Sequence, residues 1–265
     1  MIVKTEAVVL KSMKYRETSR IVTLYTRSFG KVPVIAKGAR DRKNRFGAAL
    51  QPMSRVTAVI YRKETRDLQL LSQCDLVKNF RHLTEDMDKM AAAMAAIEIV
   101  DAVTLGEEEN AQLFHALARA LEGINDATNG PRSSLYKFEV DLLDILGFRP
   151  EVQKCSRCGA PVASGVQGRD RREFSLSAGG VICLQCSFTG VGGITLSWEA
   201  LQALQALQGI ENSPALTRAL MTPAVGAEVE SALRWYLQRH VEGFRRLRSE
   251  SVFSQVLGHP SETAT

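Results

Sequence analysis

The stretch TEAVVLKSMKYRETSRIVTLYTRSFGKVPVIAKG, residues 5–38, decides the fold class of the N-terminal part of the chain. It holds three short runs rich in Val, Ile, Leu and Tyr, and polar turn clusters separate them. Two further runs follow over residues 54–63 and 67–76, and in the first of these Val56, Ala58 and Ile60 share one face. Five such strands with hairpin-length turns predict a small closed or nearly closed β-barrel.

The hydrophobic period changes from that of strands to that of helices after residue 80. We expect Thr84 to cap the first helix, Ser133 or Ser134 to cap a third, and Gly147 to end that third helix. The sequence AEVESALRWYLQRHVEGFRRLRSESVF, residues 227–253, predicts one long late helix. The chain is therefore expected to be an α+β multidomain protein. Its predicted parts are a barrel domain (1–80), a helical domain in two segments (81–150 and 193–257), an inserted cysteine module (151–192) and a disordered tail (258–265).

Charge is distributed unevenly along the chain of 265 residues, whose formal net charge is +5. Residues 1–80 carry 17 Lys and Arg against 6 Asp and Glu, whereas residues 81–150 carry 6 against 13. A polyanion is the natural partner of the first segment, although a solubilising surface that binds nothing in particular is the alternative. No run approaches the ~20 apolar residues of a membrane span, and we expect a cytoplasmic protein without a signal peptide.

Two C-x-x-C pairs, Cys155 with Cys158 and Cys183 with Cys186, form the strongest motif in the chain. Two such pairs supply the four thiolates of a tetrahedral structural Zn²⁺ site, which leaves no open position for a catalytic water. Thiol–disulfide chemistry and unligated cysteines are the alternatives. The segment between the pairs, FSLSAGGVIC, is typical of a hairpin, and Cys74 is expected to be a small core residue.

Motifs of catalysis are not found. The sequence contains no P-loop, no G-x-G-x-x-G and no G-x-S-x-G, and its four histidines are scattered. We therefore expect a binding protein and not an enzyme.

The order of these parts, a five-stranded barrel, an acidic helical middle and a four-cysteine module, resembles the RecO family of bacterial recombination mediators. Residues 5–52, with the segment AKGAR…RFGAALQP, and the segment KFEVDLLDILGFRPEVQKCSRCG, residues 137–159, carry the resemblance. It implies an oligonucleotide-binding (OB) barrel that binds single- and double-stranded DNA and anneals complementary strands. It also implies association with RecR, with the acidic C-terminal tail of single-strand-binding protein, and with the RecA pathway at the nucleoid. Some members of that family lack the cysteines, which favours a structural role for zinc.

An OB barrel explains the basic stretch KGARDRKNRFGAALQP, residues 37–52, as a loop whose cations contact phosphates without reading sequence. Gly38 and Gly47 allow a close approach to a nucleic-acid backbone. Phe46 can stack on a base or anchor the loop in the barrel, and we slightly favour the anchor. The DNA-binding residues expected on this loop and on the first hairpin are Lys11, Lys14, Arg16, Arg20, Lys37, Arg40, Arg42, Lys43, Arg45 and Phe46.

A contact to the acidic peptide tail needs an apolar pocket with cations at its edge. We expect it on the late helix, at Trp235, Tyr236, Arg239, Phe244, Arg245 and Arg246, unless the aromatic residues belong to the core. The alternative function is an RNA- or ribosome-associated zinc protein that uses the same barrel.

Overall fold

The computed structural model describes residues 1–41, 46–162, 171–187, 193–209 and 221–241, and the single residues 244, 247 and 249. The chain divides into two compact units. The first unit contains residues 1–126 together with the segment from residue 246 onward, and the second contains residues 127–245.

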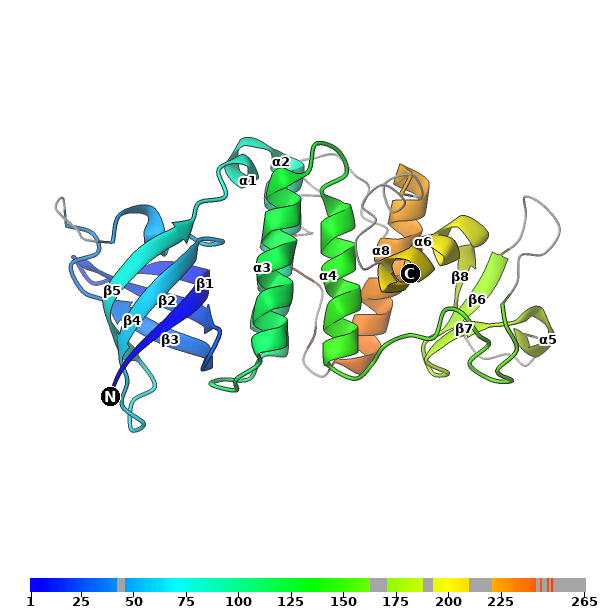
Figure 1. Cartoon of the computed structure of the whole chain (residues 1–265), viewed down its shortest axis with the longest axis horizontal. Coiled ribbons are helices and arrows are strands. Elements are labelled where there is room, and N and C mark those ends of the chain that lie inside the picture. Colours follow the sequence, from blue (N-terminus) through cyan, green and yellow to red (C-terminus); the bar gives the residue numbers. More distant parts are fainter. Residues whose placement is uncertain are drawn as a thin grey trace. The chain divides into compact units, whose positions relative to one another are not determined.

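A closed barrel forms the N-terminal part of the first unit, as the sequence predicted (Figure 1). Its strands are β1 (Ile2–Tyr15), β2 (Ser19–Thr26), β3 (Gly30–Ala36), β4 (Arg55–Tyr61) and β5 (Gln69–Lys78). Around the barrel they follow the order β1-β2-β3-β5-β4, and every pair is antiparallel except the parallel pair of β3 and β5. The barrel closes through the short pairing of Val34 and Ile35 with Gln69 and Leu70.

The barrel interior is filled by the alternate residues of each strand. Val56, Ala58 and Ile60 of β4 are buried in this core, as their alternation predicted. The longest connection of the barrel runs from the end of β3 to the start of β4, and it contains the basic stretch and the short 3-10 helix η1 (Gly47–Leu50). The fold therefore presents the basic stretch as a loop between strands.

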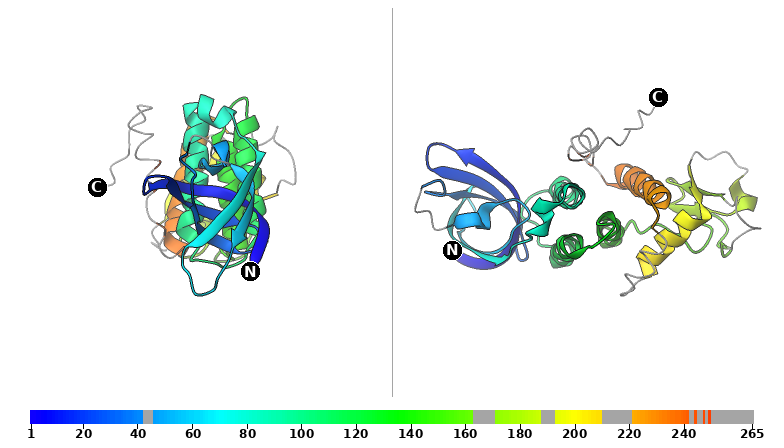
Figure 2. Two further views of the ribbon diagram at one scale, coloured as in Figure 1. Left: turned by 90° about the vertical axis from the view of Figure 1, so that its left-hand side faces the viewer. Right: turned by 90° about the horizontal axis from the view of Figure 1, so that it is seen from above.

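Helices α1 (His82–Glu85), α2 (Met87–Val103) and α3 (Ala111–Asp126) complete the described body of the first unit and lie on one side of the barrel (Figure 2). The predicted cap at Thr84 is wrong. Asp86 caps α2, because its carboxylate accepts a hydrogen bond from the backbone amide of Lys89 at 3.0 Å. An extended backbone at Asp86 separates α1 from α2, so Thr84 belongs to the short preceding helix.

A close backbone approach joins the loop between α2 and α3 to the start of β3. Gly30 has φ +61°, and a Cβ atom at this position would lie 2.2 Å from the carbonyl oxygen of Glu108. The backbone amide of Lys31 donates to the carbonyl of Gly106 at 3.0 Å. Glycine is therefore required here both by conformation and by space.

In the second unit, α6 (Trp198–Gly209) and α8 (Pro223–His240) pack on α4 (Arg132–Ile145). No side chain caps α4, so the predicted caps at Ser133 and Ser134 are wrong. These serines lie in its first turn, since the helix begins directly after Pro131.

The predicted end of α4 at Gly147 is confirmed. Gly147 has φ +80°, its amide donates to the carbonyl of Asp144, and the amide of Phe148 donates to that of Leu143. These two bonds form a Schellman motif, which satisfies the last carbonyls of the helix.

The helix α8 is shorter than predicted. It begins at a cap on Thr222 and ends at His240, with Val241 in an extended conformation. An ion pair buried between α8 and α4, with Arg234 Nη1 2.9 Å from Glu139 Oε1, fixes the two helices against each other. The described residue Phe244 therefore lies beyond the helix that was expected to present it.

The small sheet of the second unit has the strand order β7-β6-β8, with β6 (Arg171–Ser175), β7 (Gly180–Ile182) and β8 (Ile194–Ser197). The expected hairpin is confirmed as the antiparallel pair of β6 and β7. The one-turn helix α5 (Leu184–Ser187) follows β7. In the described part of the chain, no helix has both the length and the apolar character to cross a membrane.

Candidate metal centre and nucleic-acid interface

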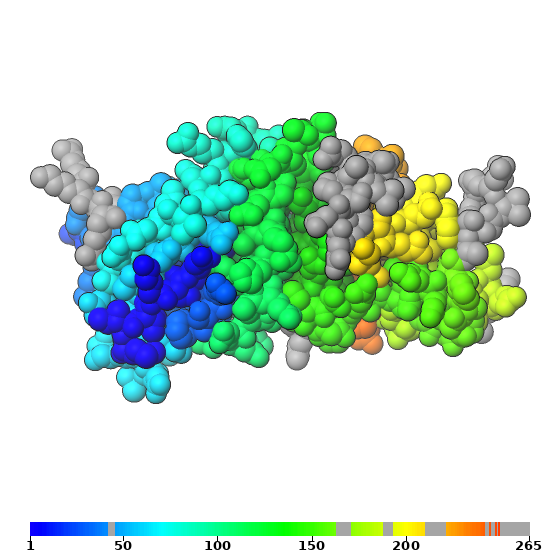
Figure 3. All heavy atoms as spheres, in the orientation of Figure 1, coloured from blue at the N-terminus to red at the C-terminus, as the bar shows by residue number. Residues whose placement is uncertain are grey.

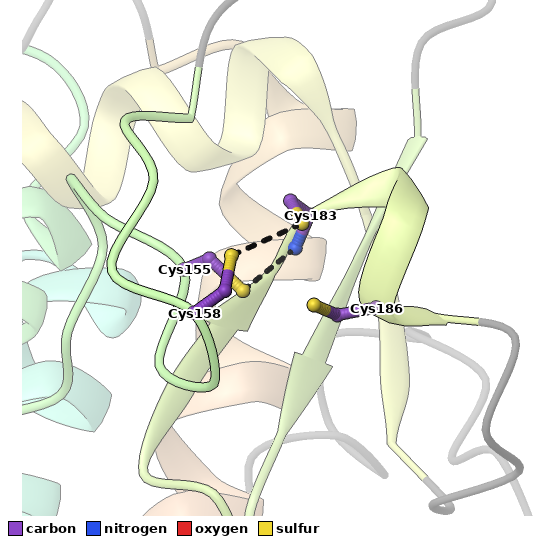
Figure 4. A group of neighbouring side chains, drawn as sticks. All are labelled: Cys155, Cys158, Cys183 and Cys186. Carbon is purple, nitrogen blue, oxygen red and sulfur yellow. Dashed lines mark hydrogen bonds between the residues drawn. The ribbon is translucent and has the colours of Figure 1, made fainter.

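The four cysteines of the two C-x-x-C pairs meet at one point in the second unit (Figure 4). Cys155 and Cys158 lie in the loop that follows α4, whereas Cys183 follows β7 and Cys186 lies on α5. Their sulfur atoms all lie within 4.8 Å of one another, and the Sγ atoms of Cys158 and Cys183 are 3.7 Å apart. Residues distant in sequence therefore bring together four sulfur donors that could hold one metal ion.

Backbone amides support this cluster. The amide of Cys183 donates to Cys155 Sγ at 3.3 Å. Gly159 has φ +73°, and its amide donates to the carbonyl of Cys155 at 2.8 Å, so the turn after the first pair needs a left-handed residue. Such outer hydrogen bonds orient sulfur ligands and stabilise negative charge on them.

The thiols of the cluster differ in their pKa values. Burial acts to raise the pKa of the Cys155 thiol, but the amides of Cys183, Cys158 and Arg157 outweigh it and lower this pKa to about 6. The pKa of Cys186 is raised to about 12 because its thiol shares hydrogen bonds with the sulfurs of Cys183 and Cys158. Four adjacent thiolates repel one another, and a metal ion replaces the shared protons with a positive charge.

Carboxylates that follow the barrel in sequence neutralise part of the barrel's charge within the first unit. Asp101 on α2 pairs with Lys11 and with Lys31. Glu122 on α3 lies 3.2 Å from Arg55 and 3.4 Å from Lys78. The charge asymmetry of the sequence is therefore partly internal, and Lys11 belongs to an ion pair, although its side chain is 59% exposed.

The remaining cations predicted on the hairpin and loop lie away from these pairs. Lys14 and Arg16 are exposed at the end of the β1–β2 hairpin, Lys37 and Arg40 are exposed at the start of the long loop, and Arg20 is half-buried and donates to Ser12. In Figure 2 the blue hairpin reaches the side of the barrel away from the helices. Arg42, Lys43 and Arg45 lie outside the described residues. Among the described residues, the structure thus distinguishes cations that are paired with carboxylates from cations that are exposed without such a pair. A count of charges along the sequence cannot make this distinction.

The hairpin end and the long loop are joined through Arg40. Its side chain donates to the carbonyl oxygen of Arg16 at 2.9 Å, and its backbone amide donates to the carbonyl of Thr18 at 2.9 Å. Arg40 therefore positions the two basic segments beside each other in addition to carrying charge. The sequence pattern had no signal for this role, since it depends on a contact between residues 24 positions apart.

Phe46 is an anchor of the loop. Its side chain is 3% exposed and lies in the barrel core with Ala49 and Leu50 of η1. The ring is not accessible to a base in this conformation, which agrees with the packing interpretation and not with base stacking.

The residues expected to bind an acidic peptide are divided between surface and core. Tyr236 is buried and its ring makes tilted contacts with the rings of Phe174 and His240, and Phe244 is buried as well. Trp235 and Arg239 are exposed on α8, while Arg245 and Arg246 lie outside the described residues. Among the described residues of this set, Trp235 and Arg239 are therefore the exposed ones.

The fold and the cysteine cluster together define a class: proteins with an N-terminal OB-type barrel and a four-cysteine centre in a helical C-terminal part. Comparisons with known families agree, since residues 1–80 match the model described as Recombination protein O N terminal, and residues 84–250 match Recombination protein O C terminal. The chain belongs to the RecO family, and its role is in DNA repair and recombination.

Curated relatives match along nearly the whole chain. The DNA repair protein RecO of Symbiobacterium thermophilum is 35% identical over 248 residues, which is 92% of this chain and 94% of the relative. The protein of the same name from Salinibacter ruber is 36% identical over 266 residues, which is 100% of this chain and 98% of the relative. The match is therefore to whole proteins and not to an isolated domain.

Proposed function

We propose that this protein is a non-enzymatic DNA-binding recombination mediator. It binds single- and double-stranded DNA through the barrel, anneals complementary strands, and helps to load the RecA recombinase onto DNA covered by single-strand-binding protein. The observation that supports this most strongly is the group of exposed cations at the hairpin end and the long loop, held together by Arg40. Contacts from such cations to phosphates give affinity without sequence preference, which a mediator acting at any lesion requires.

The metal we propose is a structural Zn²⁺ held by Cys155, Cys158, Cys183 and Cys186. Four thiolates favour zinc over magnesium or calcium, which prefer oxygen ligands. The site joins a loop, a strand end and a one-turn helix that are distant from one another in the sequence. The metal would therefore stabilise this module and leave the barrel to bind DNA.

Annealing of complementary DNA tests this function. We expect purified protein to accelerate the pairing of two complementary oligonucleotides, both bare and coated with single-strand-binding protein. The same assay with complementary RNA strands distinguishes the alternative of an RNA-associated protein. Annealing of RNA but not of DNA would contradict the proposal, and so would binding that does not weaken as salt increases.

The partners proposed are RecR and the acidic C-terminal tail of single-strand-binding protein, with Trp235 and Arg239 as the exposed contacts for the tail. The change Arg239→Glu should weaken binding of the tail peptide about tenfold or more, because like charges then meet at the contact. Peptide titration by fluorescence anisotropy measures this effect. Arg149→Glu, on an exposed arginine of the same unit, is the matched control. Equal peptide affinity of Arg239→Glu and wild type would place the contact elsewhere.

A further inference from the structure

A row of apolar side chains crosses the outer face of the barrel, and only the strand register reveals it. Met13 of β1 pairs with Ile21 of β2, Ile21 pairs with Ile35 of β3, and Ile35 pairs with Leu70 of β5. We call these four residues the apolar row. Since neighbouring strands are about 4.8 Å apart, the row extends over roughly 14 Å.

The side chains of the apolar row point away from the barrel core. In β2, β3 and β5 the neighbouring residues Val22, Val34, Ala36 and Leu71 are buried in that core, and successive side chains of a strand alternate between faces. Met13 shares the outer face of Ile21 because the two residues pair directly. Met13 is 58% exposed, and the other three residues are half-buried. Large apolar side chains are thus aligned on the surface of the barrel without a cover over Met13 from the described residues.

The apolar row continues around the barrel. Leu70 pairs with Tyr61 of β4, and Tyr61 pairs with Ile2 at the start of β1. The dark-blue start of β1 lies on the surface in Figure 3. This line of paired residues reaches β1 again at Ile2, eleven residues before Met13. Such an offset is expected because the strands of a small barrel are strongly tilted relative to its axis. Cations lie near both ends of this line, since Lys4 and Lys63 are exposed two residues after Ile2 and Tyr61, and the Met13 end is the one beside the hairpin end and the long loop.

Cations lie at both sides of the Met13 end. Lys37 follows Ile35 by two residues and Arg16 lies at the hairpin end, and both are exposed. Lys11 precedes Met13 on the same face, but its charge is shared with Asp101. Arg16 has φ +52°, a strained conformation for arginine, and the hydrogen bond from Arg40 holds its carbonyl. Strain of this kind persists where the surrounding structure holds it, and it is frequent at binding sites. The hydrogen bond from Arg40 thus holds the backbone of the hairpin end beside the long loop.

We propose that the apolar row contacts unpaired nucleobases of a single DNA strand, while the surrounding cations hold its phosphates. This inference rests on the proposed DNA binding and adds how the protein distinguishes single strands from duplex. A single strand presents apolar base faces beside a line of negative charge, which is the complement of this surface. A duplex covers its base faces by stacking, so it can use only the cations. The outer face of strands β2 and β3 is also where OB barrels accept oligonucleotides.

The test uses a double variant that carries both Met13→Ser and Ile21→Thr. Its affinities for oligo(dT) and for a blunt duplex of equal length are compared with those of wild type. We expect the variant to bind oligo(dT) about three- to tenfold more weakly. We expect its duplex affinity to be unchanged and the salt slope on both ligands to remain that of wild type, because no charge is removed. Leu105→Ser, which changes another exposed apolar residue of the same unit, is the matched control and should leave both affinities unchanged.

A second variant strengthens the test. Met13→Phe offers an aromatic face, so it should bind oligo(dT) more tightly than wild type without a gain on duplex. Equal losses of affinity for the two ligands, or no loss for either, would contradict the proposed contact with bases. Neither result would contradict the proposed contacts between cations and phosphates. A change of molecular mass in light scattering with unchanged DNA affinity would instead show that the row joins two copies of the chain. Failure of wild type to bind DNA would refute the proposed function itself.

Discussion

Replacing Cys158 with serine is expected to abolish stoichiometric zinc binding and to unfold the cysteine module, which is predicted to cover residues 151–192. The DNA affinity that the barrel provides should stay within about twofold of wild type. The four sulfurs converge within 4.8 Å, and a structural site needs all four ligands to close its coordination shell. Structural zinc contributes apparent binding free energies of about 10–16 kcal/mol in small zinc domains. Loss of one ligand therefore removes an interaction that holds the loop, the end of β7 and α5 of this module together.

Metal analysis of protein purified under reducing conditions, combined with limited proteolysis around residues 151–192, measures this result. Cys74→Ala is the matched control, because Cys74 is buried in the barrel core and burial, with Asp75, raises the pKa of its thiol to about 12. This variant should lose some stability and keep its zinc. Lowering the pH should also release the metal from wild type, since protons compete for the thiolates. Wild type that contains no zinc when expressed with zinc available would refute the site.

Neutralising the long loop is expected to reduce DNA affinity by two orders of magnitude or more at low salt. The variant carries Gln in place of Lys37, Arg40, Arg42, Lys43 and Arg45. Each lost phosphate contact should reduce the slope of log affinity against log salt by about 0.7 on single strands and about 0.9 on duplex. The loss should be equal for all sequences, because phosphate contacts carry no base information.

The structure adds two controls to this measurement. Arg40 also holds the hairpin end through the carbonyls of Arg16 and Thr18, so a variant that spares Arg40 separates charge from positioning. The double variant Lys31→Gln with Lys78→Gln removes two cations that are paired with Asp101 and Glu122. It should leave the salt slope nearly unchanged. A loop variant with the affinity and slope of wild type would show that the loop does not contact DNA.

Local sequence patterns were sufficient for most elements and for the cysteine cluster. Alternation along β4 predicted which of its residues face the core, Gly147 predicted the end of α4, and the two C-x-x-C pairs predicted one four-cysteine site. Alternation depends on neighbouring residues of one strand, the helix end depends on a backbone conformation open mainly to glycine, and the cysteine cluster depends on the chemistry of its sulfur donors. The helix starts were predicted less well, because Thr84, Ser133 and Ser134 have capping side chains but Asp86 and Pro131 precede the helices that formed. The domain boundaries proposed from sequence remain predictions.

Only the tertiary structure determined which side chains are accessible to a ligand. Closure of the barrel set the register that aligns Met13, Ile21 and Ile35, since alternation gives the face of each residue but not its neighbour on the next strand. Packing of α2 and α3 brought Asp101 and Glu122 to barrel cations that the charge count had treated as available. Packing likewise buried Phe46 and Tyr236, because an aromatic ring gains more from a core within reach than from water. Sequence fixes the chemistry that each residue carries, whereas long-range pairing and packing determine whether that chemistry is exposed.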